Sequence, residues 1–147
     1  MNPPTPTIIP GDSHTDSRGT ISFINEFNFN GVNRFYNIYH PDTSVIRAWQ
    51  GHTQEAKYYY PVKGTWVIAW VKMDFSIPED QWQAEHIILK ATDNKLLYLP
   101  PGYANGFKAL EPHSIITGFS VPGKKEETLL RWESNKWFDW NITNEAM

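Results

Sequence analysis

A chain of 147 residues is long enough to bury the core of one domain without covalent cross-links. It contains no cysteine, which excludes disulfides and thiolate metal sites, and its net charge of −3 argues against nucleic-acid binding through phosphate contacts. The N-terminal residues lack the basic and apolar regions of a signal peptide, and no run approaches the ~18 apolar residues of a membrane span. We therefore expect a cytoplasmic protein that binds neither nucleic acid nor membrane.

Residues 1–10 contain four prolines and are predicted to form an extended N-terminal arm, because proline interrupts helices and strands. Residues 11–147 are predicted to form a single domain. Its short segments of β-branched and aromatic residues are bounded by turn residues at intervals of about 8 to 12 residues, which is typical of an antiparallel sandwich or small barrel. The predicted strands are 20–23, 32–39, 45–49, 57–62, 65–72, 84–89, 95–99, 114–120 and 127–132.

No window of helical length shows a sustained 3.6-residue apolar period, and the one weak helical candidate is 78–83. The predicted fold class is therefore all-β. Aromatic residues make up 15% of the chain, and such rings either fill a β-rich core or line a ligand cleft. Trp132, Trp137 and Trp140 are expected to cap the sandwich or to pack against a second copy of the chain.

The stretch "RAWQGHTQEAKYYYPVKG", residues 47–64, carries the most chemistry. Because side chains alternate along a strand, Arg47 and Trp49 are predicted on one face and Gln50 and His52 on the other, unless a bulge intervenes. Lys57 begins the next predicted strand and can bring its ammonium toward the face that carries Gln50 and His52. The stretch therefore predicts a cluster of polar side chains on one face of two neighbouring strands.

This stretch resembles the first motif of the cupin superfamily, in which two histidines, a glutamate and a glycine follow at fixed spacing. In that frame the chain has Gln50, His52, Lys57 and Gly64, and in "PPGYAN" Asn105 replaces the histidine of the second motif. A lysine repels a divalent cation and amides bind transition metals poorly. We therefore expect no metal cofactor. A metal-dependent cupin with other ligands is the alternative.

A wider resemblance points to one cupin branch, the dTDP-4-dehydrorhamnose 3,5-epimerases and the related dTDP-sugar 3,4-ketoisomerases. It is carried by "DSRG" at Asp16–Gly19, by "IRAWQGH", by the spacing of Lys57, and by "LYLPPGYANGF" at Leu97–Phe107. The resemblance implies an RmlC-like cupin double-stranded β-helix, a jelly-roll sandwich. It also implies a homodimer with exchange of N-terminal strands. The implied substrate is a nucleotide-linked 4-keto-6-deoxysugar, with dTDP as the expected nucleotide.

Such enzymes remove a proton beside the ketone, form an enolate and return a proton, which requires a base, an acid and a positive group at the ketone oxygen. In this chain His52 is the candidate base and Lys57 the candidate enolate stabiliser, and Tyr36, which resembles a ketoisomerase tyrosine, is a candidate acid or sugar ligand. Arg47 is the candidate for the diphosphate, since guanidinium binds phosphate oxygens in a bidentate way. Arg18 is expected near the nucleotide.

The chain also departs from the family at the acid and base positions. Gln50 stands where the epimerases carry their base and Asn105 where they carry a second histidine, so both are assigned to substrate binding. The epimerase acid falls at Phe119, whose phenyl ring cannot donate a proton. A non-catalytic cupin that binds a sugar or nucleotide sugar is therefore the second hypothesis.

Structural roles are open for the same residues. His52 and Tyr36 can be ordinary core or rim residues, Lys57 can pair with Glu55, and Arg47 can link neighbouring strands.

Overall fold

The computed structural model describes residues 4–123 and 129–142, and it consists of strands joined by turns and two short 3₁₀ helices. The strands are β1 (Thr7–Pro10), β2 (Asp12–Asp16), β3 (Gly19–Phe23), β4 (Arg34–His40), β5 (Ile46–His52), β6 (Ala56–Lys63), β7 (Thr65–Lys72), β8 (Ala84–Lys90), β9 (Lys95–Leu99), β10 (Tyr103–Ala109), β11 (Ser114–Val121) and β12 (Leu130–Arg131). The 3₁₀ helices are η1 (Glu79–Gln81) and η2 (Ala91–Asp93). The predicted all-β class is confirmed.

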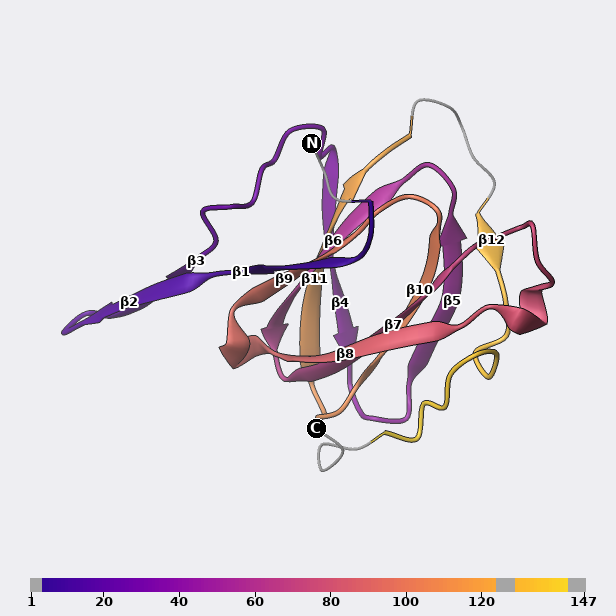
Figure 1. Ribbon diagram of the computed structural model, residues 1–147. Coiled ribbons are helices and arrows are strands. Elements are labelled where there is room, and N and C mark those ends of the chain that lie inside the picture. The colour runs from indigo at the N-terminus through magenta and orange to yellow at the C-terminus, as the bar shows by residue number, and fades with distance from the viewer. Residues whose placement is uncertain (1–3, 124–128, 143–147) are drawn as a thin grey trace.

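Two five-stranded antiparallel sheets face one another (Figure 1). The first sheet has the order β1-β9-β6-β11-β4, and the second has the order β12-β5-β10-β7-β8. Consecutive strands often lie in different sheets, so the chain crosses repeatedly between the layers as in a jelly roll. No helix in the described part of the chain has the length and apolar character needed to cross a membrane.

The space between the sheets is filled by large apolar side chains from both layers. Trp66 and Ile68 on β7 meet Leu97, Leu99 and Ile116 from the first sheet, and each is at most 3% exposed. Alternation along β7 sends the intervening residues to the opposite face of the second sheet. Removing such side chains from water supplies the main driving force for closing the two layers.

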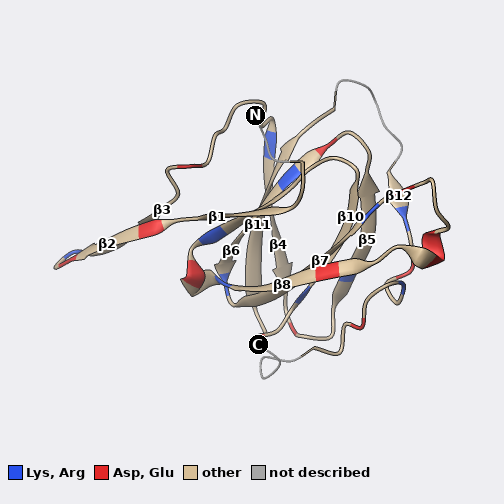
Figure 2. Ribbon diagram, in the orientation of Figure 1, with Lys and Arg blue, Asp and Glu red and all other residues tan. Residues whose placement is uncertain are grey.

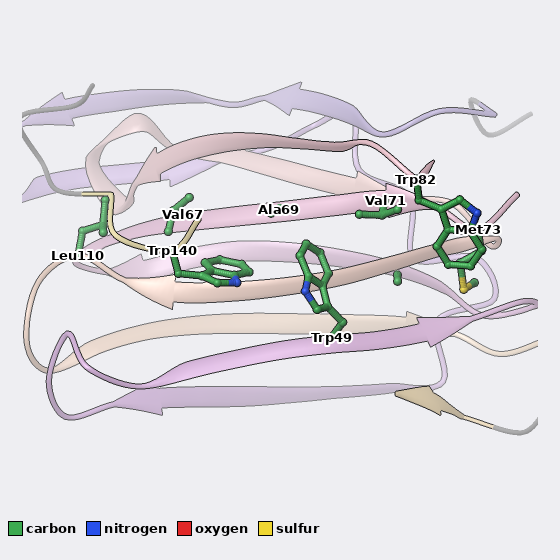
Figure 3. Packing of buried hydrophobic residues seen from close by; sticks show 9 residues of the cluster. Trp49, Val67, Ala69, Val71, Met73, Trp82, Leu110 and Trp140 are labelled. Atoms are coloured by element: carbon green, nitrogen blue, oxygen red, sulfur yellow. The ribbon is translucent and has the colours of Figure 1, made fainter. Parts of the chain in front are cut away.

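The outer face of the second sheet is covered by the C-terminal segment. Val67, Val71 and Trp49 form a buried cluster there with Trp82 and Trp140 (Figure 3). Trp132 and Trp137 pack against the same cluster. All three tryptophans of the C-terminal segment therefore cap the sandwich, which is one of the two roles predicted for them.

The N-terminal residues contribute to the sheet and to a projecting hairpin. Part of the predicted arm is β1, which pairs antiparallel with β9 at the edge of the first sheet, a position that tolerates its proline. Within the described part of the chain, β2 and β3 pair only with each other, and they extend away from the sandwich (Figure 1). Charged segments mark the far end of this hairpin, and others are scattered among the strands and loops (Figure 2).

Most predicted strands have counterparts in the structure, with ends that differ by a few residues, while β1, β2 and β10 were not predicted as strands. The helical candidate at 78–83 contains only the single turn η1. Of the predicted strand 127–132, residues 127 and 128 lie outside the described residues, and β12 accounts for 130 and 131.

Candidate functional site

A cleft of about 270 Å³ opens between the two sheets. Its walls combine cationic, phenolic and amide side chains with two apolar ones. The first sheet contributes Arg34, Tyr36, Ile38, Lys57 and Tyr59, and the second sheet contributes Arg47, Gln50, Asn105 and Phe107. Among the described residues, no carboxylate and no imidazole lines this cleft. The lining is therefore suited to an anionic or strongly hydrogen-bonding ligand.

Two tyrosines from different strands meet across β11. Gly118 on β11 is the register partner of Tyr36 on β4 and of Tyr59 on β6. A Cβ atom on Gly118 would lie 2.6 Å from Tyr36 Cζ and 2.8 Å from its hydroxyl oxygen. The missing side chain therefore provides the space in which the Tyr36 ring lies and in which the two phenols are hydrogen-bonded.

Lys57 is the buried cation of the cleft, with only 6% of its surface exposed. Its Nζ donates to the Tyr36 hydroxyl at 3.3 Å and lies 3.6 Å from Glu55 Oε1. Arg34 and Lys57 both lie over the Tyr36 ring, 5.3 and 5.6 Å from its centroid. A fixed ammonium in a site with little water stabilises negative charge much more than one in bulk solvent.

The second sheet brings Arg47 and Gln50 to the same face through an irregularity in strand pairing. On β10, Asn105 is paired with Gln50 and Phe107 with Arg47, so β5 has one residue more than β10 between these pairs. Such a bulge reverses the alternation of side chains that follow it. The prediction that Arg47 and Gln50 lie on opposite faces is therefore wrong.

His52 lies one step beyond the cleft. Pairing is regular from Gln50 to His52, which keeps both on the same side of β5, as predicted. His52 does not line the cavity, and its Nδ1 lies 3.0 Å from Glu55 Oε2. Because Glu55 also approaches Lys57, the carboxylate connects the histidine to the ammonium. The structural role considered for Lys57, an ion pair with Glu55, is therefore present together with its position at the cleft.

Arg18 is the predicted site residue that the structure leaves away from the cleft. It lies in the turn between β2 and β3, where its guanidinium binds Asp16 Oδ2 at 2.7 Å. Hydrogen bonds from Arg18 lower the pKa of the Asp16 carboxyl below its usual value. The structure therefore brings together Tyr36, Arg47, Gln50, Lys57 and Asn105, places His52 beside them, and leaves Arg18 on the hairpin.

Sequence reasoning missed Tyr59 and Arg34, and it named Glu55 only as a structural partner of Lys57. Tyr59 shares a strand face with Lys57, so alternation along β6 was the signal that could have identified it. It is 3% exposed, and this burial raises the pKa of its phenol well above the usual value. Arg34 begins β4 two residues before Tyr36, on the same face.

Phe119, at the position expected for the family's acid, faces away from the cleft. It packs on the outer face of the first sheet against Phe27 and Tyr58. The β11 residue on the cleft side is Gly118. Within the described residues, no group of three or more His, Asp or Glu side chains is arranged to hold a metal ion.

No family model matches the sequence, and no curated protein is significantly similar to it. Solved structures do match. A dTDP-4-dehydrorhamnose 3,5-epimerase from Sulfolobus tokodaii is 20% identical with a TM-score of 0.77, covering 96% of this chain and 86% of its own. This chain has the fold of an RmlC-like cupin, as predicted.

Two further structures extend the similarity. A dTDP sugar isomerase from Desulfovibrio desulfuricans is 14% identical with a TM-score of 0.77, covering 96% of this chain and 94% of its own. The epimerase RmlC from Legionella pneumophila, solved in complex with dTDP-4-keto-L-rhamnose, is 17% identical with a TM-score of 0.74, covering 97% and 81%. At these identities the similarity establishes the fold, and the reaction must be argued from the cleft.

Proposed function

We propose that the cleft binds a nucleotide-linked 4-keto-6-deoxysugar, with dTDP as nucleotide, and epimerises or isomerises it through an enolate without a metal. The observation that carries the proposal is the buried Lys57 ammonium at the cavity wall, within 3.3 Å of a phenol. An enolate oxygen seated beside Lys57 would gain the charge stabilisation that a metal supplies in other cupins. We further propose that this reaction takes place in the cytoplasm.

Other lining side chains complement the diphosphate, the hydroxyl groups and the methyl group of the proposed substrate. Arg47 and Arg34 offer guanidinium groups to the diphosphate. The amides of Gln50 and Asn105 can donate to and accept from sugar hydroxyls, and Phe107 provides an apolar surface for the 6-deoxy methyl group. The Legionella pneumophila epimerase, which shares this fold, holds a dTDP-4-keto sugar.

In this proposal His52 removes the proton from the sugar, and Tyr36 takes part in returning a proton to it. His52 stands next to the cavity on β5, and Glu55 at 3.0 Å orients its ring and accepts from Nδ1. That contact leaves Nε2 as the nitrogen that can take a proton. Catalytic contacts are often long in the absence of substrate and tighten when it binds, so a base at the cavity edge is compatible with proton abstraction.

Deuterium incorporation from solvent tests the proposal directly. Wild-type protein in D₂O should introduce deuterium beside the keto group of a dTDP-4-keto-6-deoxysugar, as followed by NMR. Lys57→Met should slow this exchange by about 100-fold, the typical effect of losing one oxyanion donor. Lys63→Met, at the exposed end of the same strand, is the matched control and should exchange at the wild-type rate. Wild-type protein that exchanges no deuterium into such sugars would rule the reaction out.

His52→Ala tests the base separately. Exchange should fall by about 100-fold or more if the imidazole removes the proton. Unchanged exchange in His52→Ala, with exchange lost in Lys57→Met, would keep the enolate chemistry and reject the histidine.

A non-catalytic nucleotide-sugar-binding protein is the second candidate. The observation that favours it is the lining of the cleft, which has no carboxylate or imidazole among the described residues. Calorimetry would then detect binding of a dTDP sugar, while NMR in D₂O would detect no exchange at any carbon.

We also propose a homodimer in which the β2–β3 hairpin reaches a second copy. Among the described residues, the hairpin pairs with no strand of the sandwich, and 84% of the Arg18 side chain is exposed. In a dimer the guanidinium could reach the nucleotide bound by the other copy. Sedimentation equilibrium should give twice the monomer mass, and a monomer at micromolar concentration would refute the assembly.

A further inference from the structure

The cleft face of β11 is unusual in carrying no side chain where two neighbouring strands each direct a tyrosine. Gly118 separates Tyr36 from Tyr59 in the strand order, yet the two phenols are hydrogen-bonded across it. A phenol delivered from β11 would compete for the same space, because even a methyl group on Gly118 would overlap the Tyr36 ring. The phenols on this face of the first sheet therefore come from β4 and β6, and β11 between them carries a glycine.

Tyr59 has the surroundings of a proton donor. Its side chain lines the cavity although the residue is 3% exposed. Asn105 Nδ2 donates to its hydroxyl oxygen at 3.4 Å, which occupies a lone pair, so the phenol's own hydrogen is available for donation, to Tyr36 in this structure and to a ligand that takes that place. Burial, aided by the hydrogen bond to Tyr36, raises the pKa of Tyr59, so the phenol keeps its proton near neutral pH.

A path for replacing that proton is also present. Tyr59 is hydrogen-bonded to Tyr36, and Tyr36 accepts from Lys57 Nζ at 3.3 Å. Lys57 in turn lies 3.6 Å from Glu55, near the edge of the cleft. A proton lost from Tyr59 can therefore be restored through Tyr36 and Lys57 from solvent.

We infer that Tyr59 is the catalytic acid of this cleft, with Tyr36 as its relay, an assignment that rests on the proposed enolate reaction. The Tyr59 O–H bond breaks and a C–H bond forms at the carbon beside the ketone. The enolate electron pair supplies that bond as the C=O double bond is restored. The resulting Tyr59 oxyanion takes a proton from Tyr36, which takes one from the Lys57 ammonium, and solvent reprotonates the amine.

The placement of acid and base on opposite sheets selects the stereochemical outcome. Tyr59 belongs to the first sheet and lines the cavity, and His52 belongs to the second sheet at the cavity edge, so in this inference the two groups approach a bound sugar ring from different sheets. Removal of a proton by His52 and return from Tyr59 inverts the carbon. With these two roles the reaction at that carbon is an epimerisation, and the proton does not return to the face it left.

Tyr59→Phe separates this acid from the base. In D₂O the variant should continue to exchange deuterium with retention, since His52 can return what it removes, while the inverted sugar forms about 100-fold more slowly. NMR couplings of the labelled carbon distinguish the two products. Tyr58→Phe is the matched control, because Tyr58 is the adjacent residue and packs on the outer face of the sheet. It should form inverted product at the wild-type rate.

The results that overturn the inference are distinct from those that overturn the proposed function. Wild-type protein that exchanges no deuterium refutes both. Wild-type protein that forms inverted product, together with a folded Tyr59→Phe that forms it equally fast, refutes the assignment of Tyr59 alone. Equal losses in Tyr59→Phe and Tyr58→Phe also refute it, because they would show a general effect on the strand. Tyr36→Phe should slow inversion while leaving exchange with retention, and inversion at the wild-type rate or faster would contradict the relay.

Discussion

Gly118→Ala places a methyl group where the Tyr36 ring now lies. The added Cβ would be 2.6 Å from Tyr36 Cε2 and Cζ, whereas carbon atoms in contact are ordinarily about 3.5–4.0 Å apart. The ring must therefore move by about 1 Å. Because Tyr36 oxygen is already 3.3 Å from Lys57 Nζ, such a movement breaks that hydrogen bond. Overpacking of this kind costs about 1–3 kcal/mol.

A double-mutant cycle assigns the cost to its cause. Urea denaturation should show Gly118→Ala losing about 1–3 kcal/mol in the wild-type background and less than about 0.5 kcal/mol in Tyr36→Ala, where the ring is absent. The melting temperature should fall by about 2–4 °C per kcal/mol in a chain of this size. Equal losses in the two backgrounds would refute the reasoning, since the methyl group would then disturb something other than the Tyr36 ring.

Two further measurements test the charges around the cleft. Burial, followed by the charge of Arg47, lowers the pKa of His40, against a smaller opposing effect of Asp42. The unfolded chain therefore binds a proton below about pH 6.5 that the folded chain resists, and the free energy of unfolding falls as pH drops through that range. His40→Gln should weaken this dependence in urea titrations between pH 5 and 7.5, and parallel curves would contradict it. Arg47→Met should weaken dTDP binding about 10-fold or more in calorimetry and leave thymidine binding unchanged, whereas equal losses for both ligands would exclude a diphosphate contact.

The strands that could be predicted are those whose own sequence resembles a strand. β7 was predicted to the residue because Thr65–Lys72 is rich in valine, isoleucine and tryptophan and is bounded by Gly64. β10 was missed because Asn105, Gly106 and Lys108 interrupt that pattern. In the structure β10 pairs with β5 on one side and β7 on the other, so hydrogen bonds to distant segments fix a strand that local propensity does not favour.

The site could be predicted only where local sequence motifs, and not contacts between distant strands, determine its residues. Lys57, Gln50 and Asn105 followed from the resemblance to the cupin and epimerase motifs, and the structure places all three at one cavity. Arg34 joins the cleft because β4 lies in the same sheet as β11 and β6, which the sequence does not state, whereas alternation with Lys57 along β6 could have identified Tyr59. The position of Arg47 depends on a bulge, and the meeting of two phenols depends on an absent side chain at Gly118.

The exchange of Gln50 and His52 relative to the epimerases changes the charge of the cavity wall. Gln50 lines the cavity, while the imidazole is moved one step outward to Glu55, away from the wall. Among the described lining residues the ionisable groups are then the two arginines, Lys57 and two phenols, with no acid to offset the cations. Glu55, beside the lining, lies 3.6 Å from Lys57 and 3.7 Å from Arg34, but one carboxylate offsets only part of the charge of three cations, so a neutral sugar would leave net positive charge at the wall. A sugar diphosphate supplies negative charge at once, and its enolate supplies more as the reaction proceeds, so the same wall favours both the ligand and the intermediate.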